Sequence, residues 1–447
     1  MGMSASPSLP PSSEPFCATD LRDAWPALAI AERADGFKLL SHTDAERFFH
    51  ELSSRDQADL LCALPGDDRR IWMRILPPDD AADLVQCAPR AAHSSLLDAL
   101  DDPTRKEVNV LLAYAEDAAG GLMNPRFARV RPEMTVDEAI SYVRKQTREC
   151  AVTIYSVYVL DQEQHLLGAV SLRDLFEAPP EKTVRDVMRV DIVRVDENTD
   201  QEEVSRLFAK HKLLAVPVVD KQLRVVGIIT VDDAVHVVEE EATEDIQKLG
   251  GSEVLGAPYM KIAFFNMVKK RAGWLSALFL GEMLTATAMG YFENEIAKAV
   301  VLALFVPLII SSGGNSGSQA TTLVIRAMAL GEVRLRDWWR VANREVMAGV
   351  VLGLTLGVIG MVRILTWQAL FHTYGTHAVV IALTVGTSLV GVVTFGTLAG
   401  SMLPFILRRL GFDPASASAP FVATLVDVTG LIIYFSVASV ILGGSLL

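Results

Sequence analysis

A single acidic residue, Asp427, lies inside an apolar stretch near the end of the chain, residues 413–433. A carboxylate within a membrane is costly unless it faces water, a partner or an ion. Ala419 and Ala423 precede it by eight and four residues, so all three share one helix face. Their small side chains let backbone approach an ion. The stretch therefore predicts the wall of a pore.

A second polar segment, SSGGNSGSQATT at residues 311–322, interrupts another apolar stretch. Its adjacent glycines, which include Gly314, predict a loosened helix with exposed carbonyls, and this is tolerated where protein or water lines the site. Asn315 begins a polar stripe at helical spacing that ends with Thr322. Packing of helices through small residues is the alternative explanation. Both stay open, and proximity to Asp427 would favour an ion path.

The groups available in these stretches are hard oxygen ligands, which argues against a soft-metal site. Magnesium keeps several waters and often binds through one or two carboxylates. One Asp427 per chain is a small ligand set, but the axis of a two-fold dimer would bring two together. Glu282 is the other acid within an apolar stretch. It either lines a cytoplasmic vestibule or caps a packing contact.

Five apolar stretches are long enough to cross about 30 Å of hydrocarbon. Basic residues gather before the first stretch, between the second and third, and between the fourth and fifth. The positive-inside rule then predicts a multi-pass protein of the cell (inner) membrane, with cytoplasmic N-terminal domains and the C-terminus outside. The predicted spans are residues 273–292, 300–325, 346–362, 379–405 and 420–442.

Charge is divided unevenly along the 447 residues. Residues 1–268 carry 46 acidic and 29 basic side chains, a net charge of −17, and residues 269–447 carry 8 and 12, a net charge of +4. An acidic front argues against nucleic acid and makes cations the natural ligands. Four cysteines without CxxC spacing indicate reduced thiols in the cytosol. The chain shows no P-loop and no nucleophile–base constellation, so neither an ATP-driven pump nor an enzyme is expected.

Leucines in the front part recur at twelve residues or a multiple of twelve, at Leu52, Leu64, Leu76 and Leu100. Three of them precede Ser, Pro, Gly and Asp, which end one helix and cap the next. The pattern predicts short helices stacked into a small superhelical array, with an irregular helical bundle as the alternative. Residues 1–40 are expected to form a disordered or variable tail, because their first residues are rich in Ser and Pro.

Residues 156–175 echo residues 215–234, with Gly168 and Asp174 recurring 59 positions later. Each copy predicts a strand, a helix, two strands joined by a turn, and another helix. An acid-rich helical run follows. Residues 257–271 then show a helix pattern interleaved with lysines, which predicts a membrane-surface helix.

With GGNSGSQATTLVIRA, DPASASAPFVATLVDVTGLIIYFSVA and TEDIQKLGG in view, the chain resembles the MgtE family of magnesium channels. The repeat, with V-x-V-x-D and GxxxxxD in both copies, resembles a pair of CBS domains. The resemblance implies a multidomain α-helical membrane protein with a cytosolic helical superhelix domain, an α/β CBS pair, a plug helix and five transmembrane helices. The expected divisions are the tail (1–40), N domain (41–121), CBS domains (122–180 and 181–240), connecting plug helix (241–271) and transmembrane domain (272–447).

The resemblance also implies a function. The family is a homodimer whose pore, between the second and fifth helices, passes Mg²⁺ passively and selectively, and Mg²⁺ bound at acidic N-domain, CBS and plug interfaces closes it. The Asp427 position lies in the selectivity site and the Ala423 position contributes backbone; with the polar segment, the expected pore residues are Asp427, Ala423, Gly314 and Asn315. The expected regulatory residues are Asp200, Glu202, Asp233, Glu241, Glu244 and Asp245.

ATP at the CBS pair is a further expectation from the family, beside Mg²⁺ as substrate and regulator and membrane lipid as surroundings. Two departures are visible. Ala419 stands where the family often has Asn, which removes an amide contact to the hydrated ion and bears on the strength of selectivity. His236 stands where the family can carry an acid, so weaker or differently tuned magnesium inhibition is expected, with gating at higher magnesium. Two other classes of function remain: a cation-coupled divalent-cation carrier, and a membrane sensor that does not transport.

Overall fold

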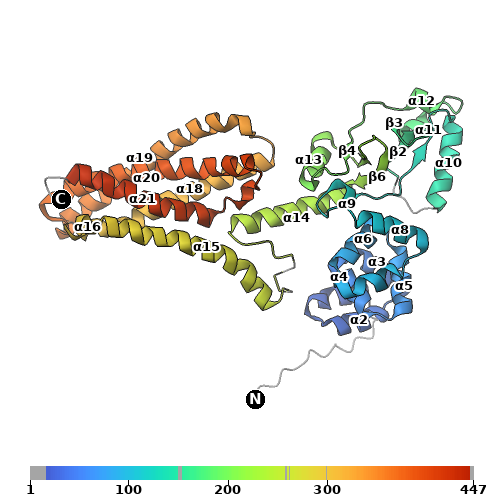
Figure 1. Ribbon diagram of the computed structural model, residues 1–447, viewed down its shortest axis with the longest axis horizontal. Coiled ribbons are helices and arrows are strands. Elements are labelled where there is room, and N and C mark those ends of the chain that lie inside the picture. Colours follow the sequence, from blue (N-terminus) through green and yellow to red (C-terminus); the bar gives the residue numbers. More distant parts are fainter. Residues whose placement is uncertain (1–16, 150–153, 257–258, 261, 299, 443–447) are drawn as a thin grey trace, which may run out of the picture. The chain divides into compact units, whose positions relative to one another are not determined.

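The computed structural model describes residues 17–149, 154–256, 259–260, 262–298 and 300–442. The chain forms two compact units, Met1–Val238 and Glu239–Leu447, whose elements are labelled in Figure 1. Cys17 and Cys62 are free thiols, and Cys150 lies outside the described residues.

The N-terminal part of the first unit is built from ten-residue helices at a spacing of twelve. The residue that closes each helix is the repeated position, Leu52, Leu64, Leu76 and finally Ala88. Alternate helices α2, α4, α6 and α8 contact one another in succession, which is the stacked, superhelical arrangement. The helices are α3 (His42–Glu51), α4 (Ser54–Ala63), α5 (Gly66–Ile75), α6 (Pro78–Cys87), α7 (His93–Leu97), α8 (Asp102–Leu111) and α9 (Ala119–Leu122).

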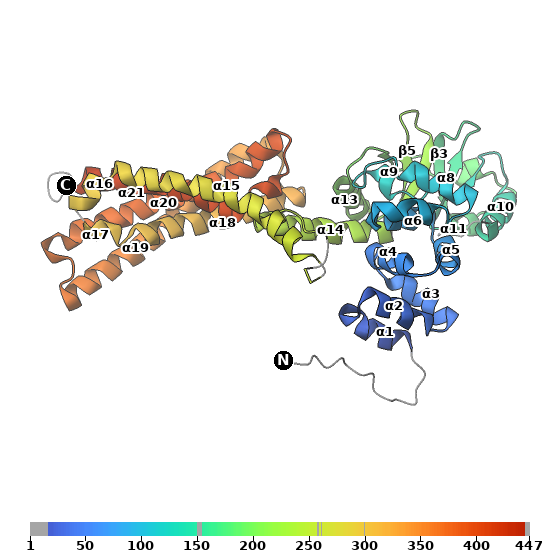
Figure 2. The same cartoon turned by 60° about the horizontal axis from the view of Figure 1, so that its bottom comes forward.

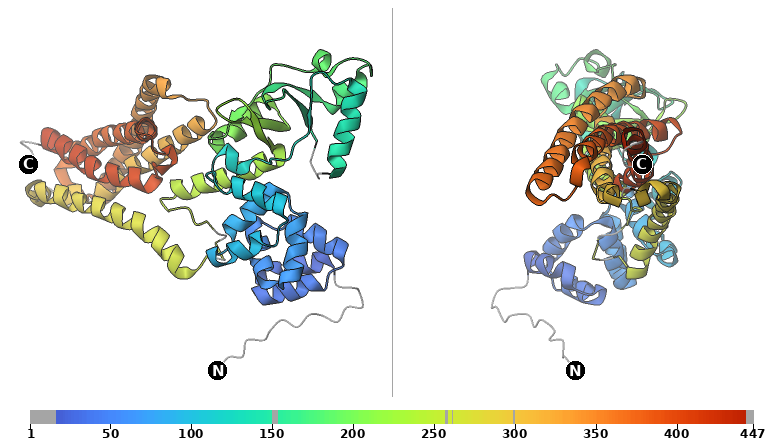
Figure 3. Two further views of the ribbon diagram at one scale, coloured as in Figure 1. Left: turned by 45° about the vertical axis from the view of Figure 1, so that its right-hand side comes forward. Right: turned by 90° about the vertical axis from the view of Figure 1, so that its left-hand side faces the viewer.

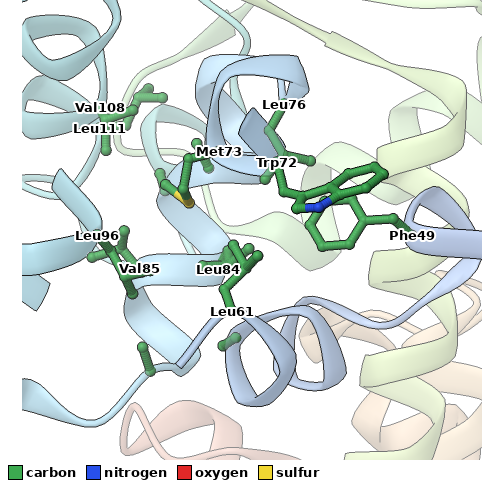
Figure 4. Packing of buried hydrophobic residues seen from close by; sticks show 14 of the residues in the cluster. Phe49, Leu61, Trp72, Met73, Leu76, Leu84, Val85, Leu96, Val108 and Leu111 are labelled. Carbon is green, nitrogen blue, oxygen red and sulfur yellow. The ribbon is translucent and has the colours of Figure 1, made fainter. Parts of the chain in front are cut away.

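A continuous apolar core joins these helices. Figure 4 shows Phe49, Trp72 and Leu61 pointing into it, and the rings of Phe49 and Trp72 have centroids 5.3 Å apart. Phe49 and Leu61 are fully buried. Burial of side chains of this size contributes about 1.5–3 kcal/mol each, so the core holds the array together.

The N-terminal domain begins earlier than predicted. Residues 17–40 are not a tail, because they form α1 (Ala18–Ala24), a 3₁₀ turn (Trp25–Ala27) and α2 (Ile30–Lys38). Leu21, Trp25 and Phe37 are buried in the same core. The Ser/Pro-rich composition that suggested disorder is concentrated in residues 1–16, which lie outside the described residues.

The two repeats of the first unit form two three-stranded sheets of the same order, β1-β2-β3 and β4-β5-β6, as predicted. Val159 pairs with Gly168 in one sheet and Val218 with Gly227 in the other. Tyr158, packed in a cluster with residues of β5 and β6, is buried between the copies. The elements are β1 (Arg129–Val130), α10 (Val136–Glu149), β2 (Ser156–Leu160), β3 (Leu166–Ser171), α11 (Leu172–Glu177), α12 (Val184–Val187), β4 (Val195–Asp196), α13 (Gln201–His211), β5 (Ala215–Val219) and β6 (Val225–Thr230).

Two helices run across predicted boundaries. Helix α14 (Val231–Leu249) continues from the second repeat through the acid-rich run, so the expected division at residue 240 falls inside it. Helix α15 (Phe264–Tyr291) joins the predicted surface helix to the first span. The prediction of a separate surface helix was wrong because residues 264–271 continue without a break into the span, through Gly273, and glycine is common in membrane helices.

The second unit contains five helices long and apolar enough to cross a membrane, among the described residues. Figures 1 and 2 show α15 running along α21, next to α18, α19 and α20, and Figure 3 shows the same helices, gold to red, from two further sides. Besides α15, the elements are α16 (Glu293–Lys298), α17 (Val300–Ala303), α18 (Val306–Ala329), a 3₁₀ turn (Leu335–Asp337), α19 (Trp338–Phe371), a 3₁₀ turn (Gly375–His377), α20 (Ala378–Arg409), a 3₁₀ turn (Pro414–Ser416) and α21 (Ala419–Leu442).

Candidate cation sites

The glycine-rich segment of α18 is an unbroken helix, so the prediction that it loosens was wrong. Its small residues permit close helix packing instead. A Cβ added at Gly313 would lie 2.6 Å from Val392, and one added at Gly317 would lie 2.8 Å from the carbonyl oxygen of Gly396. One face of α18 is therefore committed to packing against α20, and the packing explanation holds for that face.

A different face of α18 meets α21, and it contains one of the predicted pore residues. A Cβ added at Gly314 would lie 3.6 Å from Ala423, and Ser318 Oγ donates a hydrogen bond of 3.3 Å to the carbonyl oxygen of Ala419. Asn315, which is exposed, contacts Ser311 within α18. The sequence segments that suggested a pore wall are thus brought together, with Gly314 opposite Ala423.

The two helices run antiparallel in a constant register. Farther along the same interface, Tyr434 Oη donates a 2.9 Å hydrogen bond to the carbonyl oxygen of Leu302. The contacts at Gly314 and at Leu302 together define the register, which puts Asp427 level with Ile310, just before the polar segment. Asp427 is half-buried.

Asp427 also faces an acid from the first long helix. Its carboxyl group lies within hydrogen-bonding reach of the Glu282 carboxyl on α15. A second contact lies earlier in both segments, where Trp274 Nε1 donates to Ser418 Oγ over 3.2 Å. Helices α15 and α21 therefore run in the same direction. Two carboxyl groups in contact within a membrane repel each other unless a cation or a proton lies between them.

A groove of about 660 Å³ lies beside this acid pair. Glu282 and Thr424 line it together with apolar side chains of α15, such as Leu278. The close approach of Gly281 to Thr424, where an added Cβ would lie 3.0 Å from Cγ2, holds the two helices together at this level. The acid pair is thus positioned by helix packing.

A second group of acids lies in the first unit, and one of its members, Asp233, was predicted. Asp233 starts α14 and accepts hydrogen bonds from Thr230 N (3.1 Å) and Thr230 Oγ1 (2.6 Å). Burial raises its pKa to about 6 despite those hydrogen bonds. Burial and the neighbouring charges of Asp80 and Asp233 raise the pKa of Asp79 well above its ordinary value. Burial likewise raises the pKa of Asp80.

Sequence reasoning missed Asp79 and Asp80. They lie in the first turn of α6, where acids are expected because they complement the helix dipole, so they were interpreted as part of a cap. Two histidines, His50 and His236, lie close enough to Asp80 to lower its pKa partially. The one sequence signal that could have revealed the cluster is the paired acids at the starts of both α6 and α14.

The other expected regulatory acids are spread over both units. Asp200 caps α13 by accepting from Glu202 N (2.8 Å), and Glu202 pairs with Arg206. In the second unit, Glu244 pairs with Lys248, and Glu241 and Asp245 lie on the same helix, α14. In the part of the chain that the structure describes, no group of three or more His, Cys, Asp or Glu side chains is arranged to hold a metal ion.

Lys248 joins the end of α14 to the α20–α21 connection. Its Nζ lies 2.5 Å from Asp413 and also binds Glu244. Burial would lower the pKa of Lys248, but the hydrogen bonds to Asp413 and Glu244 raise it above its ordinary value. Leu249, the next residue, packs on a cluster that contains Ile325 of α18. Helix α14 is therefore attached to the membrane helices.

Five candidate membrane spans, one of which carries an acid inside its apolar part, make this a multi-pass membrane protein. Family models match in the same order along the chain. The MgtE intracellular N domain matches residues 18–117, the CBS domain matches residues 119–181 and 184–240, and a divalent cation transporter domain matches residues 306–437.

The chain belongs to the MgtE family of magnesium transporters. It is 42% identical to the magnesium transporter MgtE of Thermus thermophilus, over 95% of this chain and 92% of that protein. It is 32% identical to the Enterococcus faecalis magnesium transporter MgtE, over 94% of this chain and 93% of that protein. Among solved structures, it is similar to the cytosolic domain of the Mg²⁺ channel MgtE in complex with ATP, with 40% identity and a TM-score of 0.46 over 49% of this chain and 90% of that one.

Proposed function

We propose that this protein is a homodimeric, Mg²⁺-selective channel that mediates passive magnesium uptake and is closed by cytosolic Mg²⁺. The observation that carries the proposal is the contact between Asp427 of α21 and Glu282 of α15, deep in apolar helices. Acids placed this way favour a cation of high charge. Belonging to a family of magnesium transporters makes Mg²⁺ the expected ion.

The geometry suits a hydrated ion. Asp427 offers oxygen ligands, and the small side chains at Gly314 and Ala423 leave backbone close to its helix face. Mg²⁺ dehydrates reluctantly, so the carboxylates bind it through its waters. An inside-negative potential of 100 mV favours entry of a doubly charged ion by about 4.6 kcal/mol. No further energy source is needed, and the proposed orientation has cytoplasmic N-terminal domains and the C-terminus outside.

The proposed gate uses the acids of the first unit. Asp79, Asp80 and Asp233 repel one another when charged, so Mg²⁺ that neutralises them stabilises their close approach. Helix α14 begins at this cluster and ends at the membrane helices. A change at the cluster can therefore be transmitted along one helix. The other acids of α14 and of α13, including Glu241, Glu244, Asp245 and Asp200, remain proposed ligands.

The direct test is Mg²⁺ flux into proteoliposomes that contain a fluorescent magnesium indicator. Asp427→Ala should reduce flux at least about 100-fold, because a mutation at the ion site removes charge stabilisation of several kcal/mol. Glu332→Gln, at an exposed acid outside the apolar parts of the spans, is the matched control and should leave flux unchanged. Undiminished flux in Asp427→Ala would refute the ion path past Asp427, whereas absence of flux in the parent protein would favour a sensor that does not transport.

A cation-coupled carrier is the second candidate, because two carboxyl groups in contact are also suited to exchange a proton for a cation. Under a membrane potential and without a pH or sodium gradient, the channel should conduct and show unitary currents. Flux that saturates and requires such a gradient would favour the carrier.

ATP is proposed as a ligand of the CBS pair, on the family relationship. Calorimetric titration of the full-length protein with ATP, with and without Mg²⁺, tests it. Absence of a binding signal in both would contradict it.

A further inference from the structure

The start of helix α19 presents two different sides. On one side, Ala342 is buried and the close approaches of Gly349 to Thr394 and Gly353 to Val390 pack the helix against α20. At 100° per residue these three positions lie on one face. That face is therefore fully used by protein.

The opposite side begins with a row of arginines. Arg336, in the 3₁₀ turn before α19, and Arg340 and Arg344 of α19 are spaced by four residues and are all exposed. Arg340 and Arg344 lie opposite the packed face. Arg340, whose side chain is 87% exposed, has an ion-pair contact of 3.6 Å with Asp337, while Asp337 itself also caps the preceding turn through Arg334 N. Glu345 is turned inward and Glu332 is exposed, so positive charge predominates on this side.

The same side continues as an apolar surface. Met347 is 70% exposed, Val351 is 62% exposed and Val358 is 59% exposed, although all three belong to a candidate membrane span. In a membrane these side chains face acyl chains. The arginine row, one to three turns earlier on the same side, then lies at the level of the headgroups. Trp338 and Trp339, both exposed, lie at this level, as expected for an interfacial aromatic belt.

We propose that Arg336, Arg340 and Arg344 bind the headgroups of anionic phospholipids, with the acyl chains lying along Met347 and Val351. Guanidinium groups form paired hydrogen bonds with phosphate oxygens. The continuity from charged to apolar side chains matches the shape of a lipid, which has an anionic head above its chains. The turn at residues 335–337 is held by Val333 and Val341 on a cluster with Phe405, so the row is pre-ordered.

The experiment uses full-length protein, carrying Trp274→Phe and Trp367→Phe, in phosphatidylcholine vesicles with a small fraction of brominated phosphatidylglycerol or of brominated phosphatidylcholine. Bromine quenches tryptophan emission, and Trp338 and Trp339 report on the site. Quenching by the anionic lipid should exceed quenching by the zwitterionic lipid. In Arg336→Gln/Arg340→Gln/Arg344→Gln the apparent affinity for the anionic lipid should fall by roughly five-fold for each arginine removed.

A matched control removes the same charge elsewhere. Arg144→Gln/Arg148→Gln/Arg173→Gln, at exposed positions of the first unit, should keep the excess quenching, and the triple Arg→Lys variant should keep most of it. Quenching by brominated phosphatidylcholine reports that each variant is folded and inserted. Equal quenching of the parent by both lipids, or a triple Gln variant that keeps the excess, would overturn the proposal.

Discussion

The two groups of acids differ in what holds them together. Asp427 and Glu282 are brought into contact by long helices that pack through small residues. Asp79 and Asp233 belong to the N domain and the CBS pair, and burial and the charges of neighbouring aspartates raise the pKa values of both. Helix packing thus brings the first pair together, whereas the second group consists of acids whose burial disfavours their charged form. We propose that the first group serves passage of the ion and the second serves sensing it.

The largest effect that would sharpen this comparison is expected at Glu282. Glu282→Gln should lower Mg²⁺ flux at least about ten-fold, because it removes one of two charges near the ion. With Asp427→Asn it should be non-additive by 0.5–3 kcal/mol, as is typical of residues in contact. Flux measurements on the two single variants and the double variant test this. Strict additivity would show that the two residues act independently.

Neutralising the first-unit acids should also lower flux, but by closing the channel and not by weakening the ion site. Asp79→Asn/Asp233→Asn removes repulsion, so the closed arrangement should form without Mg²⁺ and flux should be low even in its absence. Glu163→Gln, at an exposed acid of the same unit, is the control. Flux is measured against internal Mg²⁺ concentration; a double variant that keeps the parent's full response would contradict the proposed gate.

Asp233 also predicts a pH dependence. Its pKa rises from 3.8 to about 6 in the folded protein, so the folded state binds more protons between these values and its stability falls as pH rises through that window. The loss is on the order of 3 kcal/mol by pH 7. Hydrogen exchange of α6 amides, corrected for intrinsic rate, should show less protection at pH 7.5 than at pH 5 without Mg²⁺. Asp233→Asn should reduce this difference in protection. An unchanged difference would contradict the attribution of the pH dependence to Asp233.

Breaking the attachment of α14 should act more weakly. Lys248→Gln removes the contacts to Asp413 and Glu244, and partly exposed ion pairs contribute about 1 kcal/mol or less. The Mg²⁺ concentration for half-closure should rise about two- to five-fold. Lys248→Arg should respond like the parent. A Gln variant with unaltered gating would mean that α14 acts without this ion pair.

The smallest effect is expected at Ala419, where an amide is missing relative to the family pattern. The Ala419 carbonyl oxygen already accepts from Ser318, so the backbone there is held in place. Ala419→Asn should increase discrimination between Mg²⁺ and Ca²⁺ by a few-fold, measured as competing fluxes. A decrease would show that the small side chain is needed.

Periodicity predicted the helical array, the paired sheets and the spans because each repeats or is long. It did not locate helix boundaries at α14 and α15, where no strong breaker separates neighbouring segments. The prediction that glycines such as Gly313 and Gly317 loosen α18 was also wrong. Composition does not tell whether a glycine loosens a helix or lets a neighbouring helix approach. The contact between Glu282 and Asp427 depends on helix register, which a single sequence does not contain.

The central claim is tested most directly by anomalous diffraction from crystals of the full-length protein soaked in Mn²⁺ as a substitute for Mg²⁺. The account predicts a Mn²⁺ peak on a two-fold axis, between the Asp427 carboxylates of two subunits and displaced by excess Mg²⁺. Asp427 facing lipid, or lying far from its counterpart with no peak beside it, would contradict the account.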